Sequence, residues 1–321
     1  MDIIRTPIEN LHHFLPENNY IYTIDSNVLE LYPYLVDSVN YIKVECCEEN
    51  KTLEQVYEIY EKFHELEVNR DTFIVGIGGG ILCDICGFVC STYLRGLSFS
   101  FVPTTLLAQV DASIGGKNGV NFKGYKNQIG TINLPKFSLI DLKFLDTLDD
   151  IEFLNGLAEI LKYSFIYDHP PLRYIEENKY KILNKDPKVL KKIITDSKET
   201  KQAFVNSDFL ESNERKKLNF GHTFGHAIEK RIPQHHGFAV AYGMKLASAL
   251  SNEMGYLESG KTNRIYEIID FFGFPNFDYS IDINDFKKDK KSHGNYIDFI
   301  LLEDIGKSKI VSINYENLKD L

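Results

Sequence analysis

Four of the nine histidines in this chain lie between positions 222 and 236. His222 and His226 are four residues apart, and on a helix this spacing points both imidazoles to the same side. His235 and His236 follow, directly before Gly237. Histidine is the commonest metal ligand and the side chain that titrates nearest neutral pH. The cluster therefore predicts a metal site or a proton-transfer site.

Spacing by itself leaves the kind of site open. Zinc metalloproteases also have two histidines four residues apart, but their motif places Glu directly after the first one. Thr223 stands there in this chain, which excludes the protease motif. Two core or surface histidines without a chemical role remain the alternative on spacing alone.

A glycine-rich turn, Gly78, Gly79 and Gly80, follows a predicted buried strand and opens a predicted helix. Glycines at such a place let backbone amides approach a pyrophosphate at the helix N-terminus. The usual dinucleotide fingerprint is absent, because Ile81 stands where a third glycine or alanine belongs. The alternative is a tight turn that needs glycine for a positive φ.

The five cysteines predict no metal site and no disulfide framework. Cys83, Cys86 and Cys90 have the spacing of a buried helix stripe, and only Cys46 and Cys47 could complete a second pair. An odd count in a chain too long to need disulfides fits a reducing cytoplasm.

Composition narrows the classes of partner. The chain has 321 residues, 43% hydrophobic and 26% charged, with a formal net charge of −10. This charge argues against nucleic acid or an anionic membrane as a partner, so an anionic substrate would need a local basic cluster. Residues 1–7 lack the apolar core of a signal peptide, and no run of about twenty apolar residues could span a membrane.

The first half of the chain alternates strand and helix patterns. A helix is expected at 53–66, and strands are expected at 20–24, 41–44, 73–77 and 97–102. This rhythm predicts an α/β, Rossmann-like domain with a mostly parallel sheet.

The second half is mainly helical. Strand patterns return only at 298–302 and 308–312, and helices are expected at 151–167, 170–178, 187–205, 222–232, 239–254 and 261–272. We therefore predict an α/β domain over 1–148 and an α-helical domain over 149–321.

Several segments together resemble one family, the 3-dehydroquinate synthases among the sugar-phosphate cyclases. The resemblance runs from about residue 25 to 306, and the matching segments are 78–84, 91–96, 103–121, 126–127, 156–162 and 218–226. It implies a carbon–oxygen lyase of the shikimate pathway of aromatic amino acid biosynthesis. Such an enzyme converts 3-deoxy-D-arabino-heptulosonate 7-phosphate by transient oxidation with NAD, phosphate elimination, reduction and aldol closure.

The resemblance also implies two cofactors, NAD and one divalent metal, which is zinc, cobalt or another. Glu159, His222 and His236 would be the metal ligands, and His226 would serve proton transfer instead. One carboxylate and two imidazoles with an open position form a usual catalytic zinc set. The positions that would hold NAD are Asp25, Asn27, Glu48, Lys51, Gly79, Gly80, Asp84, Thr104, Thr105, Thr147 and Leu148.

The implied substrate is a phosphorylated sugar acid. Its carboxylate would be clamped by Lys201 and Arg215, and Asp111 and Lys126 would complete the site. Arg95 would reach the phosphate from a neighbouring subunit, which implies a homodimer. The other positions that match phosphate contacts of the family are Lys117, Asn127, Lys162 and Asn219.

Two positions depart from the family pattern. Phe238 stands where the family usually has Glu, a change beside the last ligand that can alter metal affinity. Asp298 stands where the family has a basic residue, which leaves Lys290 or Lys291 as candidates to supply that charge.

Three rival functions remain. A cyclase acting on glucose 6-phosphate would not need Lys201 and Arg215, because that substrate has no carboxylate. A metal-dependent polyol dehydrogenase of related fold is disfavoured by segments 111–121 and 156–162. A non-enzymatic binding protein would not need metal ligands, a hydride acceptor and a phosphate clamp together.

Overall fold

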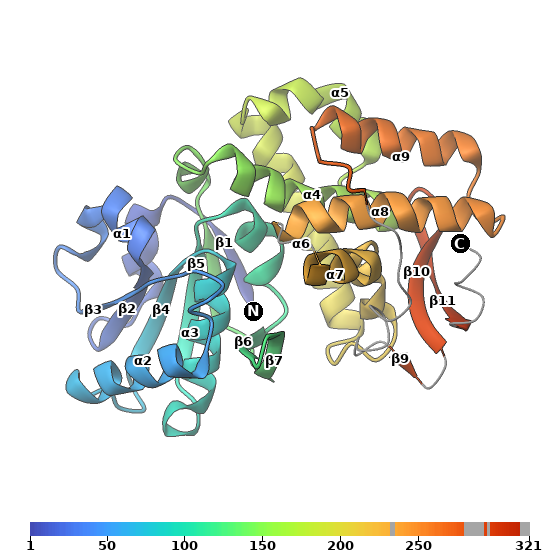
Figure 1. Cartoon of the computed structure of the whole chain (residues 1–321). Helices are drawn as coiled ribbons and strands as arrows, with labels where there is room; N and C mark the ends of the chain where they lie inside the picture. The colour runs from blue at the N-terminus through green and yellow to red at the C-terminus, as the bar shows by residue number, and fades with distance from the viewer. Residues whose placement is uncertain (232–234, 279–291, 294–295, 315–321) are drawn as a thin grey trace. The chain divides into compact units, whose positions relative to one another are not determined.

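The computed structural model describes residues 1–231, 235–278, 292–293 and 296–314. The chain divides into two compact units, Met1–Phe153 and Leu154–Leu321. The first unit runs from blue to green in Figure 1, and the second runs from green to red. The division falls within α4 (Asp150–Tyr167), whereas the boundary expected from the sequence lies just before this helix.

The first unit is built on a six-stranded sheet with the strand order β1-β8-β5-β4-β2-β3. Every pairing in this sheet is parallel, as predicted. The strands are β1 (Asp2–Arg5), β2 (Tyr20–Asp25), β3 (Tyr41–Val44), β4 (Phe73–Gly78), β5 (Ser98–Pro103) and β8 (Phe137–Ile140).

Helices cover both faces of this sheet. On one face, α2 (Leu53–Glu65) and α3 (Gly80–Thr92) pack on side chains such as Ile74. On the other face, α1 (Ser26–Leu31) packs on side chains such as Val75. The short helices η1 (Ile8–Phe14) and η5 (Leu142–Leu145) contribute to this second face. Because successive strand residues point to opposite faces and both faces are buried, the strands appear in the sequence as continuous apolar runs.

The predicted strands of this unit and the predicted helix at 53–66 are confirmed, but four strands were not predicted. These are β1, β8 and the antiparallel hairpin of β6 (Lys117–Phe122) and β7 (Tyr125–Ile132). Strand β7 is polar and largely exposed, and β6 is rich in Asn and Gly, so the hairpin lacks the apolar alternation from which strands are predicted. Strands β1 and β8 are only four residues long; β1 pairs with β8, and β8 pairs with β5 as well.

The second unit is mainly helical, as predicted. Its helices are α4, α5 (Leu172–Leu183), α6 (Pro187–Ser207), η6 (Glu214–Asn219), α7 (His222–Arg231), α8 (His236–Glu253) and α9 (Ser259–Phe271). A small antiparallel sheet joins β9 (Ser292–His293), β10 (Tyr296–Asp304) and β11 (Lys307–Asn314), as Figure 1 shows in red. Helix α8 begins three positions before the predicted start at 239, which places His236 in its first turn.

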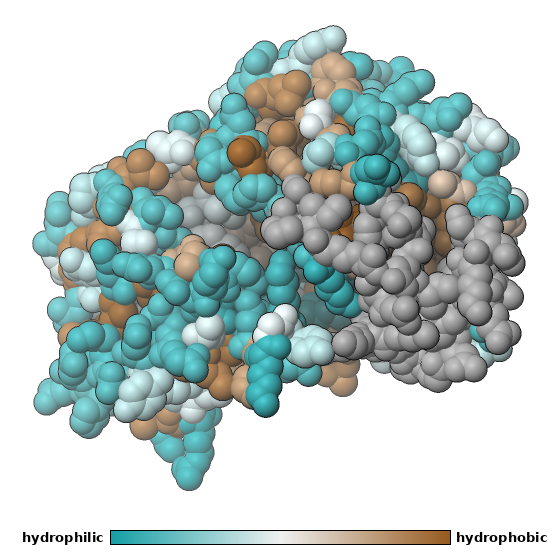
Figure 2. Space-filling view, in the orientation of Figure 1, coloured by the Kyte–Doolittle hydropathy of each residue, from teal (hydrophilic) through white to brown (hydrophobic). Residues whose placement is uncertain are grey.

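Apolar side chains are exposed on several elements of the described residues. Figure 2 shows hydrophilic residues over much of the visible face, with apolar residues scattered among them. Exposed large apolar side chains come from separate elements, for example Leu31, Tyr57 and Tyr180. Among the residues that the structure describes, no helix combines the length and the apolar character needed to cross a membrane.

Candidate active site

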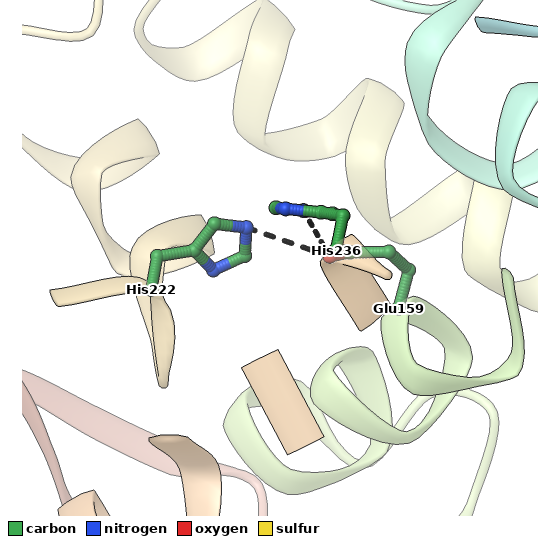
Figure 3. Close-up of side chains that lie close together, drawn as sticks. All are labelled: Glu159, His222 and His236. Carbon is green, nitrogen blue, oxygen red and sulfur yellow. Dashed lines mark ion pairs between the residues drawn. The ribbon is translucent and has the colours of Figure 1, made fainter. Parts of the chain in front are cut away.

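Glu159, His222 and His236 converge within the second unit, each from a different helix. The Oε1 atom of Glu159 lies 3.4 Å from Nε2 of His222 and 3.6 Å from Nε2 of His236 (Figure 3). One ligand atom from each residue lies within 4.8 Å of the other two. A carboxylate oxygen and two imidazole nitrogens at this separation can bind one divalent cation.

Close packing of α7 against α8 sets the position of His222. Gly221 precedes the helix with a φ of +77°, a conformation that glycine adopts without strain. A Cβ atom at Gly221 would lie 2.5 Å from Cγ of Met244 on α8 and 2.8 Å from the carbonyl oxygen of Val240. Only glycine therefore allows the chain to enter α7 this close to α8.

A hydrogen bond at Nδ1 orients the ring of His222 so that Nε2 faces Glu159. Its Nδ1 lies 3.1 Å from the carbonyl oxygen of Phe220, which can only accept a hydrogen bond. A neutral ring that donates from Nδ1 to this carbonyl leaves the lone pair of Nε2 for a cation bound together with Glu159. A backbone carbonyl in this role is a usual means of orienting a histidine ligand.

The ring of His236 lies between two carboxylates. Its Nδ1 is 3.5 Å from Oε1 of Glu229 on α7, while its Nε2 faces Glu159. Burial lowers the pKa of His236, but the carboxylates of Glu159 and Glu229 outweigh it and raise the pKa to about 9. Without a cation, this histidine is therefore protonated at neutral pH. The sequence analysis did not single out Glu229.

Lys162 contacts the other oxygen of the Glu159 carboxylate. It lies one turn further along α4, and its Nζ donates a hydrogen bond to Oε2 of Glu159. Both side chains are almost completely buried. Glu159 thus turns one oxygen to the histidines and the other to an ammonium group, which fixes the orientation of its carboxylate.

His226 lies beside the cluster but is not among its three ligands. Its ring centroid is 5.6 Å from that of His222, and the two rings are nearly perpendicular. The ring of His236 is 5.2 Å from that of His222 and 6.4 Å from that of His226. The atoms that converge on Glu159 therefore come from His222 and His236, rather than from the pair that helix spacing favours.

In the first unit, the glycine-rich turn lies at the carboxyl end of β4, beside the end of β2. Gly79 is the N-cap of α3, and a Cβ at Gly78 would lie 3.0 Å from Cβ of Asp25. None of Gly78, Gly79 and Gly80 has a positive φ, so the alternative of a left-handed turn is wrong. Close packing explains glycine best at Gly78, where a Cβ would lie 2.8 Å from Cβ of Leu82; a Cβ at Gly79 would lie 3.1 Å from Thr105.

Asp25 is nearly buried at the end of β2 and caps α1 by accepting a hydrogen bond from the backbone N–H of Asn27 at 2.9 Å. Burial raises the pKa of Asp25, although this hydrogen bond opposes the shift. A carboxylate beside a glycine turn and a helix N-terminus is the arrangement that binds the ribose and pyrophosphate of a dinucleotide. The residues of this unit therefore fit NAD.

Further residues expected to bind NAD form one polar network. The Nζ of Lys51 donates to Asp84 at 2.5 Å and to Oδ1 of Asn127 at 2.6 Å. Asn121 donates to Oε1 of Glu48 at 2.7 Å and accepts from the backbone N–H of Asn127 at 2.9 Å. Asn121 thus joins residues assigned to cofactor and to substrate, a role the sequence analysis missed because the contacts are non-local.

The remaining predicted residues of this unit occupy loops and the hairpin. Thr104 donates its N–H to the carbonyl of Gly78 at 3.0 Å, and the hydroxyl of Thr147 lies 2.7 Å from that of Tyr32. Leu148 follows Thr147 directly, and Asp111 lies in η4 (Ala108–Ala112), a π-helical turn. The exposed residues among those predicted for this unit are Asn27, Arg95, Lys117, Lys126, Asn127 and Thr147.

Arg95 lies on an exposed turn with unusual backbone geometry. Leu94 and Arg95 have φ angles of 50° and 69°, and Gly96 follows with 122°. Two successive non-glycine residues rarely adopt left-handed conformations, which cost energy and often mark functional positions.

The predicted carboxylate clamp consists of two buried cations in the second unit. Lys201 on α6 is 6% exposed and Arg215 in η6 is 2% exposed. Nη1 of Arg215 donates to the carbonyl of Phe209 at 2.7 Å. Asn219, predicted to bind phosphate, donates to Oε1 of Glu211 at 2.8 Å.

Asp208 organises the loop that carries Arg215. Its carboxylate accepts hydrogen bonds from the backbone N–H groups of Ser212, Asn213 and Arg215. The bond from Asn213 is the main cause that lowers the pKa of Asp208 to about 2. This stabilisation is present in full above the ordinary pKa of an aspartate and is lost progressively as the pH falls from there through about 2.

The two departures from the family pattern have local partners. Phe238 packs edge-on against Phe274, with ring centroids 5.8 Å apart, so an apolar contact replaces a carboxylate. Asp298 accepts a hydrogen bond from Ser312 at 2.6 Å and lies 3.5 Å from the ammonium of Lys216. The candidates Lys290 and Lys291 lie outside the described residues.

Comparison with known proteins identifies the family in both units. Residues 41–155 match the model of the 3-dehydroquinate synthase N-terminal domain, and residues 156–292 match that of its C-terminal domain.

Two solved enzyme structures share the fold over 99% of this chain. The 2-epi-5-epi-valiolone synthase from Streptomyces hygroscopicus subsp. jinggangensis, with NAD+ and Zn2+ bound, has a TM-score of 0.90 at 25% identity, over 94% of its chain. A 2-deoxy-scyllo-inosose synthase complexed with carbaglucose-6-phosphate, NAD+ and Co2+ has a TM-score of 0.88 at 24% identity, over 95% of its chain.

Relatives with higher sequence identity are 3-dehydroquinate synthases. A 3-dehydroquinate synthase from Thermoanaerobacter pseudethanolicus is 42% identical over 87% of this chain and 81% of the relative. One from Dictyoglomus thermophilum is 39% identical over 96% of this chain and 86% of the relative. With identities this high over most of both chains, and with both domain models matched, the chain belongs to the 3-dehydroquinate synthase family.

Proposed function

We propose that this protein is a 3-dehydroquinate synthase. It converts 3-deoxy-D-arabino-heptulosonate 7-phosphate into 3-dehydroquinate and phosphate, and is a carbon–oxygen lyase of the shikimate pathway in the cytoplasm. The observation that carries the proposal is the convergence of Glu159, His222 and His236 in a chain of this family. The five free cysteines fit the proposed compartment.

The proposed cofactors are NAD and one divalent metal. Support comes from the related structures, of which one contains NAD+ with Zn2+ and the other NAD+ with Co2+. Glu159, His222 and His236 would hold the metal, and the turn at Gly79 with Asp25 would hold the dinucleotide. When bound, NAD supplies a reversible hydride acceptor and the metal a positive charge beside the reacting hydroxyl group.

The side chains of the second unit then have separate tasks in the reaction. The imidazole of His226, beside His222, accepts and returns a proton at a ring nitrogen during elimination. Lys162 holds the Glu159 carboxylate in place and adds positive charge for the leaving phosphate. Arg215 and Lys201 bind the substrate carboxylate, for which the planar guanidinium offers two parallel hydrogen bonds.

A cyclase acting on glucose 6-phosphate is the second candidate, because the related 2-deoxy-scyllo-inosose synthase was solved with carbaglucose-6-phosphate. Two arguments favour the first candidate. Identity to the 3-dehydroquinate synthases reaches 42%, against 24% to that enzyme. A substrate without a carboxylate would also leave the buried cations Arg215 and Lys201 without a use in binding.

The direct test is incubation of the purified protein with the proposed substrate, NAD and zinc, with phosphate and NADH measured together. We expect phosphate release over many turnovers without net NADH, because the hydride is returned within each cycle. Glucose 6-phosphate should release none under the same conditions. NADH accumulating in step with substrate consumption would instead identify a dehydrogenase.

We also propose a homodimer in which Arg95 serves the partner's active site. Support comes from the exposed turn at Arg95, where the chain adopts a costly conformation. Arg95→Ala and His226→Ala should each be nearly inactive alone. Mixed under conditions of subunit exchange, they should regain part of the activity, because hybrid dimers contain one intact site. Proof of exchange without any recovery of activity would contradict the shared site.

A further inference from the structure

The first turn of α8 is held against α4 by one buried side chain. The Oδ1 atom of Asn155 accepts a hydrogen bond from the backbone N–H of Gly237. Asn155 is 6% exposed, and Gly237 is buried as well. The N–H groups of a first helical turn have no partners within the helix, so a side-chain oxygen at this place acts as a cap.

The two backbones also touch at this point. A Cβ atom at Gly237 would lie only 2.7 Å from Cα of Asn155, closer than real side chains approach. Glycine is therefore required for α8 to begin against α4. The Asn155–Gly237 contact is a fixed junction between the two helices, and it leaves little freedom for the residues beside it.

The junction lies directly beside two of the three cluster residues. Asn155 precedes Glu159 by four residues on α4, so both side chains lie on the same face of that helix. His236 immediately precedes Gly237 in the first turn of α8. The distance of 3.6 Å from Oε1 of Glu159 to Nε2 of His236 thus spans two helices that are joined one helical turn away.

We propose that Asn155 is a positioning residue for the metal site, because it fixes the backbone of His236 opposite Glu159. The ring of His236 has its own support from Glu229, 3.5 Å from Nδ1, so the two residues hold different parts of the same ligand. This inference rests on the metal binding in the proposed function. It adds a fourth residue, Asn155, on which metal binding depends although Asn155 is not a ligand.

The test is the metal affinity of Asn155→Ala, measured by competition with a chelator and without NAD or substrate. The substitution removes the acceptor for Gly237 and frees the first turn of α8. We expect zinc to bind roughly 10-fold to 100-fold more weakly, the usual effect of losing an outer support of a metal ligand. The absorption spectrum of the Co2+ form should also change, because it reports the number and geometry of ligands.

Asn155→Asp provides the conservative rescue. A carboxylate oxygen can accept the same N–H and suits the positive end of a helix. Its zinc affinity should stay within a few-fold of that of the wild type.

Asp186→Ala is the matched control for a lost helix cap in the same unit. Asp186 caps α6 by accepting from the N–H groups of Lys188 and Val189, each at 3.0 Å. This variant should lose stability but keep its zinc affinity. Wild-type affinity in Asn155→Ala, or an equal loss in Asp186→Ala, would overturn the proposal. If Asn155→Ala does not fold, Asn155→Ser is judged by the same criterion.

Metal binding by the wild type and by Glu159→Gln distinguishes failure of the positioning role of Asn155 from failure of the proposed metal site. The wild type should bind one metal per chain, and Glu159→Gln should lose it. A wild type that binds no metal would overturn the proposed metal site, and the role of Asn155 with it. A wild type that binds metal, with unchanged affinity in Asn155→Ala, would overturn only the positioning role.

Discussion

Replacement of Arg215 by alanine should lower kcat/KM by roughly 10²-fold to 10³-fold, because a buried anion then loses one charged partner. Arg215 is 2% exposed and is held by the carbonyl of Phe209 and by the loop that Asp208 organises. Metal and NAD binding should be unchanged, since neither the cluster residues nor the glycine turn is altered. Steady-state kinetics with zinc and NAD titrations would measure both effects.

Two further variants show what Arg215 contributes. Arg215→Lys should recover only part of the activity, because a point charge cannot replace the two parallel hydrogen bonds of a guanidinium. Arg264→Ala is the control, since Arg264 lies in the same unit and pairs with Glu176 at 2.6 Å outside the predicted site. It should keep wild-type kcat/KM. A wild-type value in Arg215→Ala would favour the cyclases of glucose 6-phosphate instead.

Removal of the His222 imidazole should empty the metal site. We expect His222→Ala to retain only a small fraction of one metal per chain after dialysis, and to lose activity in proportion. The reason is that only Glu159 and His236 remain of the three protein ligands, while Lys162 still places a positive charge on the other oxygen of Glu159. Elemental analysis of the dialysed protein measures the result.

His64→Ala is the control for this experiment, because His64 is an exposed histidine in the last turn of α2. It should retain one metal per chain. Full metal occupancy in His222→Ala would show that the metal site is elsewhere. Loss in both variants would point to a general effect of purification rather than to the ligand.

Much of the fold could be predicted because local patterns reflect it directly. The runs at Phe73–Gly78 and Ser98–Pro103 are apolar because both sheet faces are covered, and such runs identify buried parallel strands. The stripe of Cys83, Cys86 and Cys90 likewise marks the buried face of α3, where each is at most 1% exposed. Hairpin β6–β7 was missed because its polar strands are defined by pairing with each other.

For the candidate site, the sequence by itself determined the residue types and the family. It placed His222 and His226 four residues apart and showed a glycine turn after a strand, and its ordered segments resembled one family, which implied Glu159 and His236 as partners of His222. Helix spacing alone favoured a different pair. The spacing of residues within one helix shows which of its side chains share a face. It does not show which side chains of a second helix lie close to them.

Only the tertiary structure decided which atoms meet. His222, His236 and Glu159 lie on three helices, and their approach depends on packing that glycine alone permits, at Gly221 and at Gly237. The contact of Asn155 with Gly237 joins residues 82 positions apart, and that of Glu229 with His236 joins neighbouring helices. Such contacts depend on the shape of both packed surfaces, and neither surface is encoded in the local pattern of a single segment.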